Sequence, residues 1–212
     1  MDGSPPGSRV RDTPRVRVRL SADERRAQII ASAVAVIADR GFAAATATEI
    51  AATAGVAKGL VWRYFADRDD LMLRTAQHLD ETLRAEVVGR LDLDVPATDV
   101  VRQALRHLAS LTRTHAAQLR ALDQIIHNLV TPDGAQRLSL ADYERGYRLQ
   151  EELFARGVAE GSMSPADTRV MAVTYQGAID AMIAYLTAHP EVDTDTYAEQ
   201  LADILVQGLA TR

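Results

Sequence analysis

The segment of residues 46–65 constrains the fold more than any other part of the chain. Thr46 and Glu49 have the spacing of a capping box, in which the Thr side chain accepts from a first-turn amide and the Glu side chain reaches back. This spacing predicts a helix that begins at about Ala47. Gly55 can adopt the left-handed backbone conformation that ends a helix, because it has no Cβ atom.

A second short helix is expected directly after this turn, from about Ala57. Val61 and Phe65 are four residues apart and therefore share its buried face. The opposite face is left with basic and aromatic side chains, namely Lys58, Trp62 and Arg63. Two short helices joined by a tight glycine-containing turn are typical of a helix-turn-helix, whose second helix enters a DNA major groove.

Five motifs in this region, taken in order, resemble the DNA-binding region of the TetR (tetracycline-repressor) family. They are Gly41-Phe42, Thr46-x-x-Glu49-Ile50-Ala51, Ala54-Gly55-Val56-x-Lys58-Gly59, Trp62-x-Tyr64-Phe65 and Arg68-x-x-Leu71. Each motif is weak evidence alone, but their order over about thirty residues is specific. The alternative is an ordinary helical hairpin, and burial does not explain so many basic and aromatic residues on one short helix.

Side-chain type and the matching motif positions together predict the DNA contacts. These are Thr48, Lys58, Gly59, Leu60, Trp62, Arg63, Tyr64 and Arg68. Lys58 and Arg63 are long donors that can reach guanine edges or phosphates, and Gly59 lets the backbone approach closely. Trp62 stands where the family usually has a phosphate-binding Tyr, and Arg68 replaces the family's usual Lys.

Two positions depart from the family pattern. Ala57 stands where Ser is common, so the second helix lacks a side-chain cap worth about 1 kcal/mol. Leu60 stands where Thr is common, and it could touch a thymine methyl instead of a phosphate. A second hypothesis is therefore a helical dimer that acts as a protein-interaction module with a degenerate helix-turn-helix.

Charge is distributed unevenly along the chain. The formal net charge of −5 would by itself argue against a nucleic-acid partner. Residues 1–70, however, hold 11 Lys and Arg against 9 Asp and Glu, whereas residues 71–212 hold 13 against 20. The end that carries the helix-turn-helix is thus basic, and this local field is what attracts phosphate. Its only lysine, Lys58, lies in the second helix of the motif.

Composition excludes several classes of protein. The chain has no cysteine, which excludes disulfides, thiolate zinc sites and cysteine nucleophiles. No apolar run approaches the ~20 residues of a membrane span, and no apolar region follows the arginine-rich start. We expect a cytoplasmic, nucleoid-associated protein with no membrane partner. Residues 1–20, rich in Pro, Gly and Arg, are expected to form a disordered arm that either contacts DNA or is simply solvated.

Apolar residues recur at helical spacing through the rest of the chain, and no strand pattern is found. Ser21 and Glu24 predict a capped first helix that ends near Gly41, and Asp67 predicts the cap of a long helix that reaches residue 91. Further helices are expected at about residues 100–111, 115–130, 135–160, 165–188 and 194–210. The fold class is therefore all-α, with a three-helix N-terminal helix-turn-helix domain (residues 21–67) joined by a long helix to a C-terminal helical domain (residues 68–212).

The resemblance implies that this C-terminal domain binds a ligand and forms a homodimer through its last two helices. A small-residue face fits close helix approach, and the expected interface comprises Gly177, Ala178, Ala181, Ala184, Leu201 and Leu205. The alternative is that these faces serve a single monomer core. A two-fold dimer would place two recognition helices in successive major grooves of double-stranded DNA, which predicts a palindromic target.

The resemblance also implies a cavity for an unidentified, partly hydrophobic small-molecule effector whose binding releases DNA. Polar residues beside apolar stripes are the candidate lining: His107, Gln124, His127, Asn128, Tyr143, Tyr147, Tyr175 and Gln176. Each could equally be a surface or satisfied core residue. In such a family the regulator is most often a repressor.

Catalysis is not expected. His107, His115 and Asp123 are spaced eight residues apart, not the three or four of a helical metal site. The chain also lacks a glycine-rich phosphate loop and a Gly-x-Ser-x-Gly elbow. We therefore expect no cofactor and no bound metal.

Overall fold

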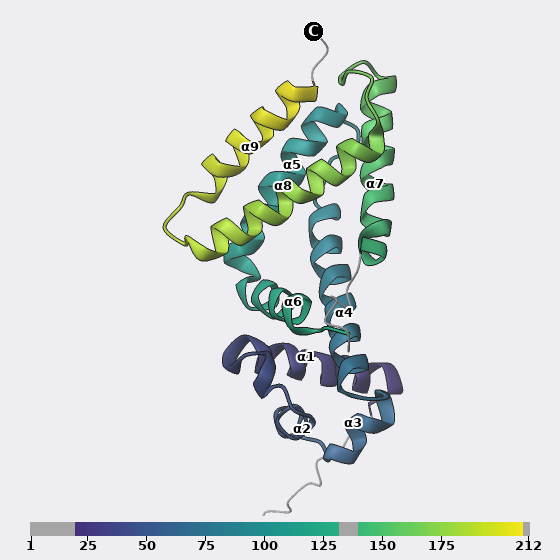
Figure 1. Cartoon of the computed structure of the whole chain (residues 1–212), viewed down its shortest axis with the longest axis vertical. Coiled ribbons are helices and arrows are strands. Elements are labelled where there is room, and N and C mark those ends of the chain that lie inside the picture. Colours follow the sequence, from purple (N-terminus) through teal and green to yellow (C-terminus); the bar gives the residue numbers. More distant parts are fainter. Residues whose placement is uncertain (1–19, 132–139, 210–212) are drawn as a thin grey trace, which may run out of the picture.

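The computed structural model describes residues 20–131 and 140–209, and its elements in those ranges are nine α-helices and one short 3-10 helix (Figure 1). The all-α prediction is confirmed. The elements are α1 (Ala22–Arg40), η1 (Phe42–Ala44), α2 (Ala47–Ala54), α3 (Lys58–Tyr64), α4 (Arg68–Val88), α5 (Ala97–Thr114), α6 (Ala116–Asn128), α7 (Leu140–Ala159), α8 (Thr168–Ala188) and α9 (Thr194–Leu209). The predicted arm lies almost wholly outside the described residues, as does the start of the predicted helix at 135–160.

The first and fourth helices begin with the caps that the sequence predicts. Ser21 accepts a hydrogen bond from the Glu24 backbone N–H at 3.2 Å, and the Glu24 carboxylate accepts from the Ser21 N–H at 2.7 Å. These bonds to Ser21 lower the pKa of Glu24. Asp67 accepts from the Asp70 N–H at 2.8 Å and so starts α4. Both helix starts therefore follow from local sequence.

The predicted capping box of α2 is only half formed. Thr46 accepts from the Glu49 N–H at 3.3 Å, but the Glu49 carboxylate pairs with Arg40 at 2.7 Å instead of reaching back. The Thr46 N–H is already satisfied, because it donates to the Ala44 carbonyl at 2.7 Å. The prediction of a reciprocal box was wrong because η1 and α1 supply better partners.

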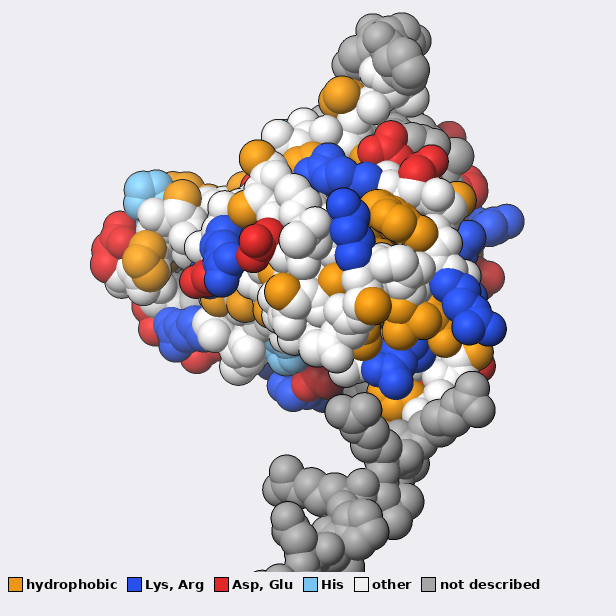
Figure 2. Space-filling model, turned by 90° about the horizontal axis from the view of Figure 1, so that it is seen from below, with side chains coloured by type: hydrophobic (Ala, Val, Ile, Leu, Met, Phe, Trp, Pro, Cys, Tyr) orange, Lys and Arg blue, Asp and Glu red, His pale blue; other side chains and the backbone are white. Residues whose placement is uncertain are grey.

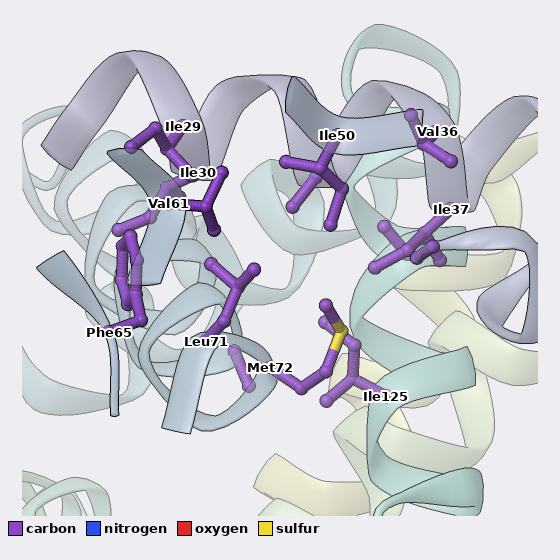
Figure 3. Packing of buried hydrophobic residues seen from close by; sticks show 14 of the residues in the cluster. Ile29, Ile30, Val36, Ile37, Ile50, Val61, Phe65, Leu71, Met72 and Ile125 are labelled. Carbon is purple, nitrogen blue, oxygen red and sulfur yellow. The ribbon is translucent and has the colours of Figure 1, made fainter. Parts of the chain in front are cut away.

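One hydrophobic core unites the N-terminal helices with parts of α4 and α6 (Figure 3). Ile29, Ile37, Ile50, Val61 and Leu71 are fully buried in it. The same core also contains Ile125 and Leu129 at the end of α6. The core thus crosses the domain boundary expected at residues 67 and 68, so α6 is packed directly onto the helix-turn-helix support.

A second core forms between α5, α7, α8 and α9 in the other half of the molecule. Its largest buried side chains include Phe154, Met163 and Met182. Arg102 of α5 adds an ion pair to Asp203 of α9 at 2.6 Å. A smaller cluster joins α4 to α5 and α6. The long helix α4 therefore connects the two cores mechanically.

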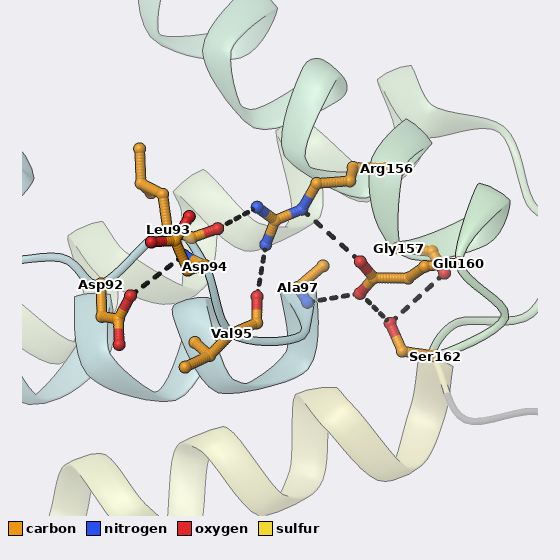
Figure 4. A network of polar contacts seen from close by, with 9 residues as sticks. All are labelled: Asp92, Leu93, Asp94, Val95, Ala97, Arg156, Gly157, Glu160 and Ser162. Atoms are coloured by element: carbon orange, nitrogen blue, oxygen red, sulfur yellow. Dashed lines mark hydrogen bonds and ion pairs between the residues drawn. The ribbon is translucent and has the colours of Figure 1, made fainter.

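A polar network fixes the α4–α5 loop to the end of α7 (Figure 4). Arg156 donates to the carbonyls of Leu93 at 2.7 Å and Val95 at 3.0 Å. Glu160 accepts from the Ala97 N–H at 2.5 Å, which lowers the pKa of this carboxyl. The first turn of α5 is thereby capped by a side chain 63 residues away in sequence.

None of the described helices is both long enough and apolar enough to serve as a membrane span. A search of the same residues finds no group of three or more His, Asp or Glu side chains placed to hold a metal ion.

Candidate nucleic-acid interface

The turn between α2 and α3 depends on the conformation of Gly55. Its φ of 66° lies in the left-handed region, and its N–H donates toward the carbonyls of Ala51 and Ala52. Val56 N–H also donates to Ala51 at 2.9 Å, which closes the end of α2. A Cβ atom at Gly55 would meet nothing within 4 Å, so the backbone angle and not space requires glycine here.

Helix α3 is held by one apolar face and presents the other to solvent. Val61 is fully buried and Phe65 is 2% exposed. Lys58, Trp62 and Arg63 are exposed on the opposite side, as their spacing predicts. Seen from this end of the molecule, Lys and Arg side chains lie among hydrophobic ones across the surface (Figure 2).

The two basic side chains of α3 have no acidic partner among the described residues. No ion pair within 4.0 Å involves Lys58 or Arg63. The nearest acids in sequence are committed elsewhere, since Asp67 caps α4 and Asp70 pairs with Arg74 at 2.8 Å. Both cations are therefore free to meet phosphates or base edges.

Gly59 and Thr48 lie where the sequence analysis expects them. Both are exposed, Gly59 in the first turn of α3 and Thr48 in the first turn of α2. A Cβ atom at Gly59 would meet nothing within 4 Å, so a second molecule can approach its backbone.

Three other predicted contacts are turned partly inward. Leu60 and Tyr64 are half-buried, and Tyr64 packs against the N-terminal core. Arg68 donates to the Phe42 carbonyl at 2.7 Å, and its guanidinium lies 4.3 Å from the centre of the Phe42 ring. In this structure Arg68 braces the loop before α2, and its phosphate contact stays a prediction.

Gln28 is a positioning residue that the sequence analysis missed. Its amide donates to the Ala54 carbonyl at 2.9 Å and so fixes the last turn of α2 to α1. Arg25 in turn donates to the Gln28 side-chain oxygen at 2.6 Å. The only sequence signal was a polar residue next to the apolar stripe of α1, which does not reveal a partner 26 residues away.

The outer face of α8 and α9 leaves apolar side chains in solvent. Val170 is 62% exposed, Val173 45%, Tyr185 44% and Ile204 68%. Of the predicted interface residues, Gly177, Ala181 and Ala184 are exposed on this face, and Ala178, Leu201 and Leu205 are half-buried. Asp180 lies beside them, and burial raises the pKa of its carboxyl despite a hydrogen bond from Gln176.

The predicted ligand-binding residues of α6 face the DNA-binding half or solvent. Gln124 accepts a hydrogen bond from the Phe42 backbone N–H at 2.7 Å, which joins α6 to η1. His127 and Asn128 are exposed and bond to carbonyls of their own helix. His107, on α5, is half-buried.

The candidates on α7 and α8 pack into or beside the second core. The Tyr143 and Tyr147 rings stack at 6.2 Å, and Tyr175 meets Phe154 edge to face at 5.6 Å. The Tyr175 hydroxyl is buried with no hydrogen-bond partner among the described residues, and burial raises its pKa. Gln176 accepts from Gln150 at 2.8 Å.

Two surface pockets open in the described part of the chain, and none of the eight ligand candidates lines either one. One lies between the α4–α5 loop and the end of α7, and the other lies near the start of α6. The role of the eight residues in ligand binding stays a prediction.

Comparisons with known proteins agree with this geometry. Residues 29–75, which include α2, α3 and their supports, match the model of the bacterial regulatory proteins of the tetR family. The chain is 33% identical over 70 residues to the HTH-type transcriptional regulator HbdR of Aromatoleum sp. (strain CIB), and this alignment covers 33% of the chain and 31% of HbdR. It is 25% identical to the HTH-type transcriptional regulator AcrR of Shigella flexneri, over 90% of the chain and 92% of AcrR.

The whole fold also has a solved counterpart. The crystal structure of a TetR-family transcriptional regulator from Haemophilus influenzae Rd superposes with a TM-score of 0.70, covering 91% of this chain and all of that one. The two chains are only 14% identical, so this likeness concerns the fold alone.

Proposed function

The chain belongs to the TetR family of transcriptional regulators, and on this premise we propose that it is a repressor that binds a palindromic operator as a homodimer and leaves it when a small, partly hydrophobic effector binds. The observation that carries the DNA-binding part is the pair Lys58 and Arg63, exposed on α3 with no ion-pair partner among the described residues. Such a regulator acts on chromosomal DNA, which places it in the cytoplasm at the nucleoid.

A dimer is required because α3 is only seven residues long. One such helix buries too little surface for operator-level affinity, whereas a two-fold pair reads two half-sites about 34–36 Å apart or a little more. The exposed apolar face of α8 and α9 supports a second copy as the partner, because Val170 and Ile204 are more than 60% exposed. Gly177 and Gly208 leave open space there for a helix to approach closely.

An operator shift assay with the DNA that flanks the protein's own gene tests the DNA-binding proposal. The wild-type chain should retain this DNA specifically, and retention should fall steeply as salt rises. The double variant Lys58→Ala with Arg63→Ala should lose it, whereas Arg90→Ala, which removes an arginine at the far end of α4, should not. Retention that survives the double variant would favour the alternative, a protein-interaction module with a degenerate helix-turn-helix.

Sedimentation velocity tests the dimer. Ile204→Glu and Ala181→Glu place a carboxylate on the exposed α8–α9 face and should give monomers, because an unpaired charge cannot be desolvated there cheaply. Leu93→Glu is the matched control, since Leu93 is 55% exposed in the α4–α5 loop. A wild-type chain that sediments as a monomer at micromolar concentration would contradict the proposal.

The sign of regulation needs a promoter–reporter fusion in cells. If the chain is a repressor, deletion of its gene raises expression from the flanking promoter, and an activator gives the opposite result. The effector must bind the form that does not bind DNA more tightly than the form that does, because only that difference can release the operator.

A further inference from the structure

A recessed pocket of about 230 Å³ lies where the end of α5, the first turn of α6 and the α8–α9 loop meet. Figure 1 shows these segments converging at one side of the C-terminal half. Two arginines, Arg113 and Arg120, line the pocket together with Ala116 at the start of α6. Leu186 and Val192 provide apolar wall.

The positive charge at this pocket is largely uncompensated. Arg120 has no ion pair with any described residue, and Arg113 has one long contact, 3.9 Å to Asp193. No side chain caps α6, and no acidic residue lies in its first turn. The free N–H groups of a helix start carry partial positive charge, so they add to the field of the two guanidinium groups.

A buried hydroxyl in the same pocket gives independent evidence for a ligand. Thr194 is only 4% exposed and lines the pocket, yet its side chain has no hydrogen-bond partner among the described residues. Leaving such a group unsatisfied costs about 1–3 kcal/mol. A polar atom of a bound molecule would satisfy it.

We propose that this pocket binds a small organic carboxylate, whose charged end meets Arg113, Arg120 and the start of α6 and whose short apolar part lies against Leu186 and Val192. The volume holds about eight groups of the size of a water molecule. A compact acid therefore fits better than a long-chain one. Bare inorganic phosphate would leave the apolar wall uncovered.

Helix α6 connects this pocket to the DNA-binding half, so the carboxylate is a candidate for the effector in the proposed function, on which this step rests. The helix runs 13 residues from the pocket, and Gln124 near its other end accepts from the Phe42 N–H at 2.7 Å. Ile125 and Leu129 belong to the core that supports α3. A ligand that displaces the start of α6 would therefore act on that core.

Calorimetry on the full chain with acetate, butyrate and benzoate, and with benzamide as the uncharged match of benzoate, tests the site. Benzoate or butyrate should bind saturably, and benzamide and inorganic phosphate at least tenfold more weakly. Arg120→Gln and Thr194→Val should each weaken the carboxylate about tenfold or less, in line with a loss of one hydrogen bond. Arg90→Gln removes a charge away from the pocket and should change nothing.

Failure of all three acids to bind below about 10 mM would overturn the proposal. Equal binding of benzoate and benzamide, or binding that Arg120→Gln leaves unchanged, would overturn it too. The operator assay then separates the two levels. Carboxylate binding without any DNA retention refutes the proposed function but supports the site, and carboxylate binding that leaves retention unchanged refutes the effector role alone.

Discussion

The two ends of the molecule use their basic side chains in different ways. On α3, Lys58 and Arg63 are exposed and have no acidic partner among the described residues. In the C-terminal half most arginines are paired across helices: Arg102 meets Asp203 at 2.6 Å, and Arg169 meets Glu144 at 2.7 Å. The same residue type is thus a connector in one half and a free donor in the other.

This difference indicates where a ligand is needed to complete the electrostatics. A paired arginine has its donors occupied and contributes to holding helices together, whereas an unpaired one contributes little to the fold. Arg120 is unusual because it lies in the paired half and yet has no described partner. By this criterion α3 is the interface for a polyanion, and the pocket beside Arg120 is a site for a small anion.

The largest expected effect comes from the unpaired cations, and it can be read from salt dependence. A side chain that contacts phosphate reduces the slope of log affinity against log salt by about 0.9 per contact in each half-site when removed. Lys58→Ala should therefore lower the slope by about 2 in a dimer if Lys58 binds phosphate. If it reads a guanine, the loss of about 1–3 kcal/mol per half-site should fall on the matched operator only.

Arg102→Gln is the matched control, because this arginine is paired to Asp203 in the other half. Its operator affinity and salt slope should equal those of the wild type. An equal loss from Arg102→Gln would show that overall charge, not the placement on α3, governs DNA binding, and the contrast between the two halves would fail.

The second effect concerns stability and should leave DNA binding intact. Arg156→Met removes the two hydrogen bonds to the carbonyls of Leu93 and Val95 but keeps most of the side-chain volume. We expect the free energy of unfolding to fall by about 1–3 kcal/mol, because charged donors to carbonyls are strong and their acceptors would lose them. Urea unfolding at constant m-value measures this, and Arg148→Met, an exposed arginine of the same helix, should change it little.

The sequence predicted most of the fold because its signals are local. Caps at Ser21 and Asp67, the turn at Gly55 and the buried pair Val61 and Phe65 involve residues within four or five positions of each other, and the structure confirms them. A pattern of period 3.6 reports which face is buried, so Gly177 and Ala181 were correctly placed on an open face.

The parts that sequence did not predict depend on distant partners. Gln124 was a candidate ligand contact, but its acceptor is occupied by the Phe42 N–H 82 residues away. The half-formed capping box at Thr46 failed because Arg40, in another helix, takes the Glu49 carboxylate. Side-chain type shows that such a group needs a partner but not which one the fold supplies.

A third, smaller effect should come from the contact that joins the halves. Gln124→Ala leaves the half-buried Phe42 N–H without its acceptor, so stability should fall by about 1 kcal/mol. Its more informative result is functional: any carboxylate effect on operator retention should weaken, while carboxylate affinity itself stays close to wild type. Asn128→Ala is the control, because Asn128 bonds only within α6. If both variants retain the full response, coupling does not pass through Gln124.

The smallest effect should be a gain, at the start of α3. Ala57 precedes this helix in an extended conformation, with φ of −69° and ψ of 141°, and supplies no side-chain cap. Ala57→Ser places a hydroxyl within reach of the free first-turn N–H groups and should stabilise the chain by about 0.5–1 kcal/mol, whereas Ala57→Val should not. Thermal unfolding measures both variants. Because Lys58 and Arg63 then start from a better-ordered helix, operator affinity should rise slightly with Ser. An affinity that falls instead would mean that DNA binding requires α3 to loosen, and the free cations would then owe their role to adaptability, not to a preset position.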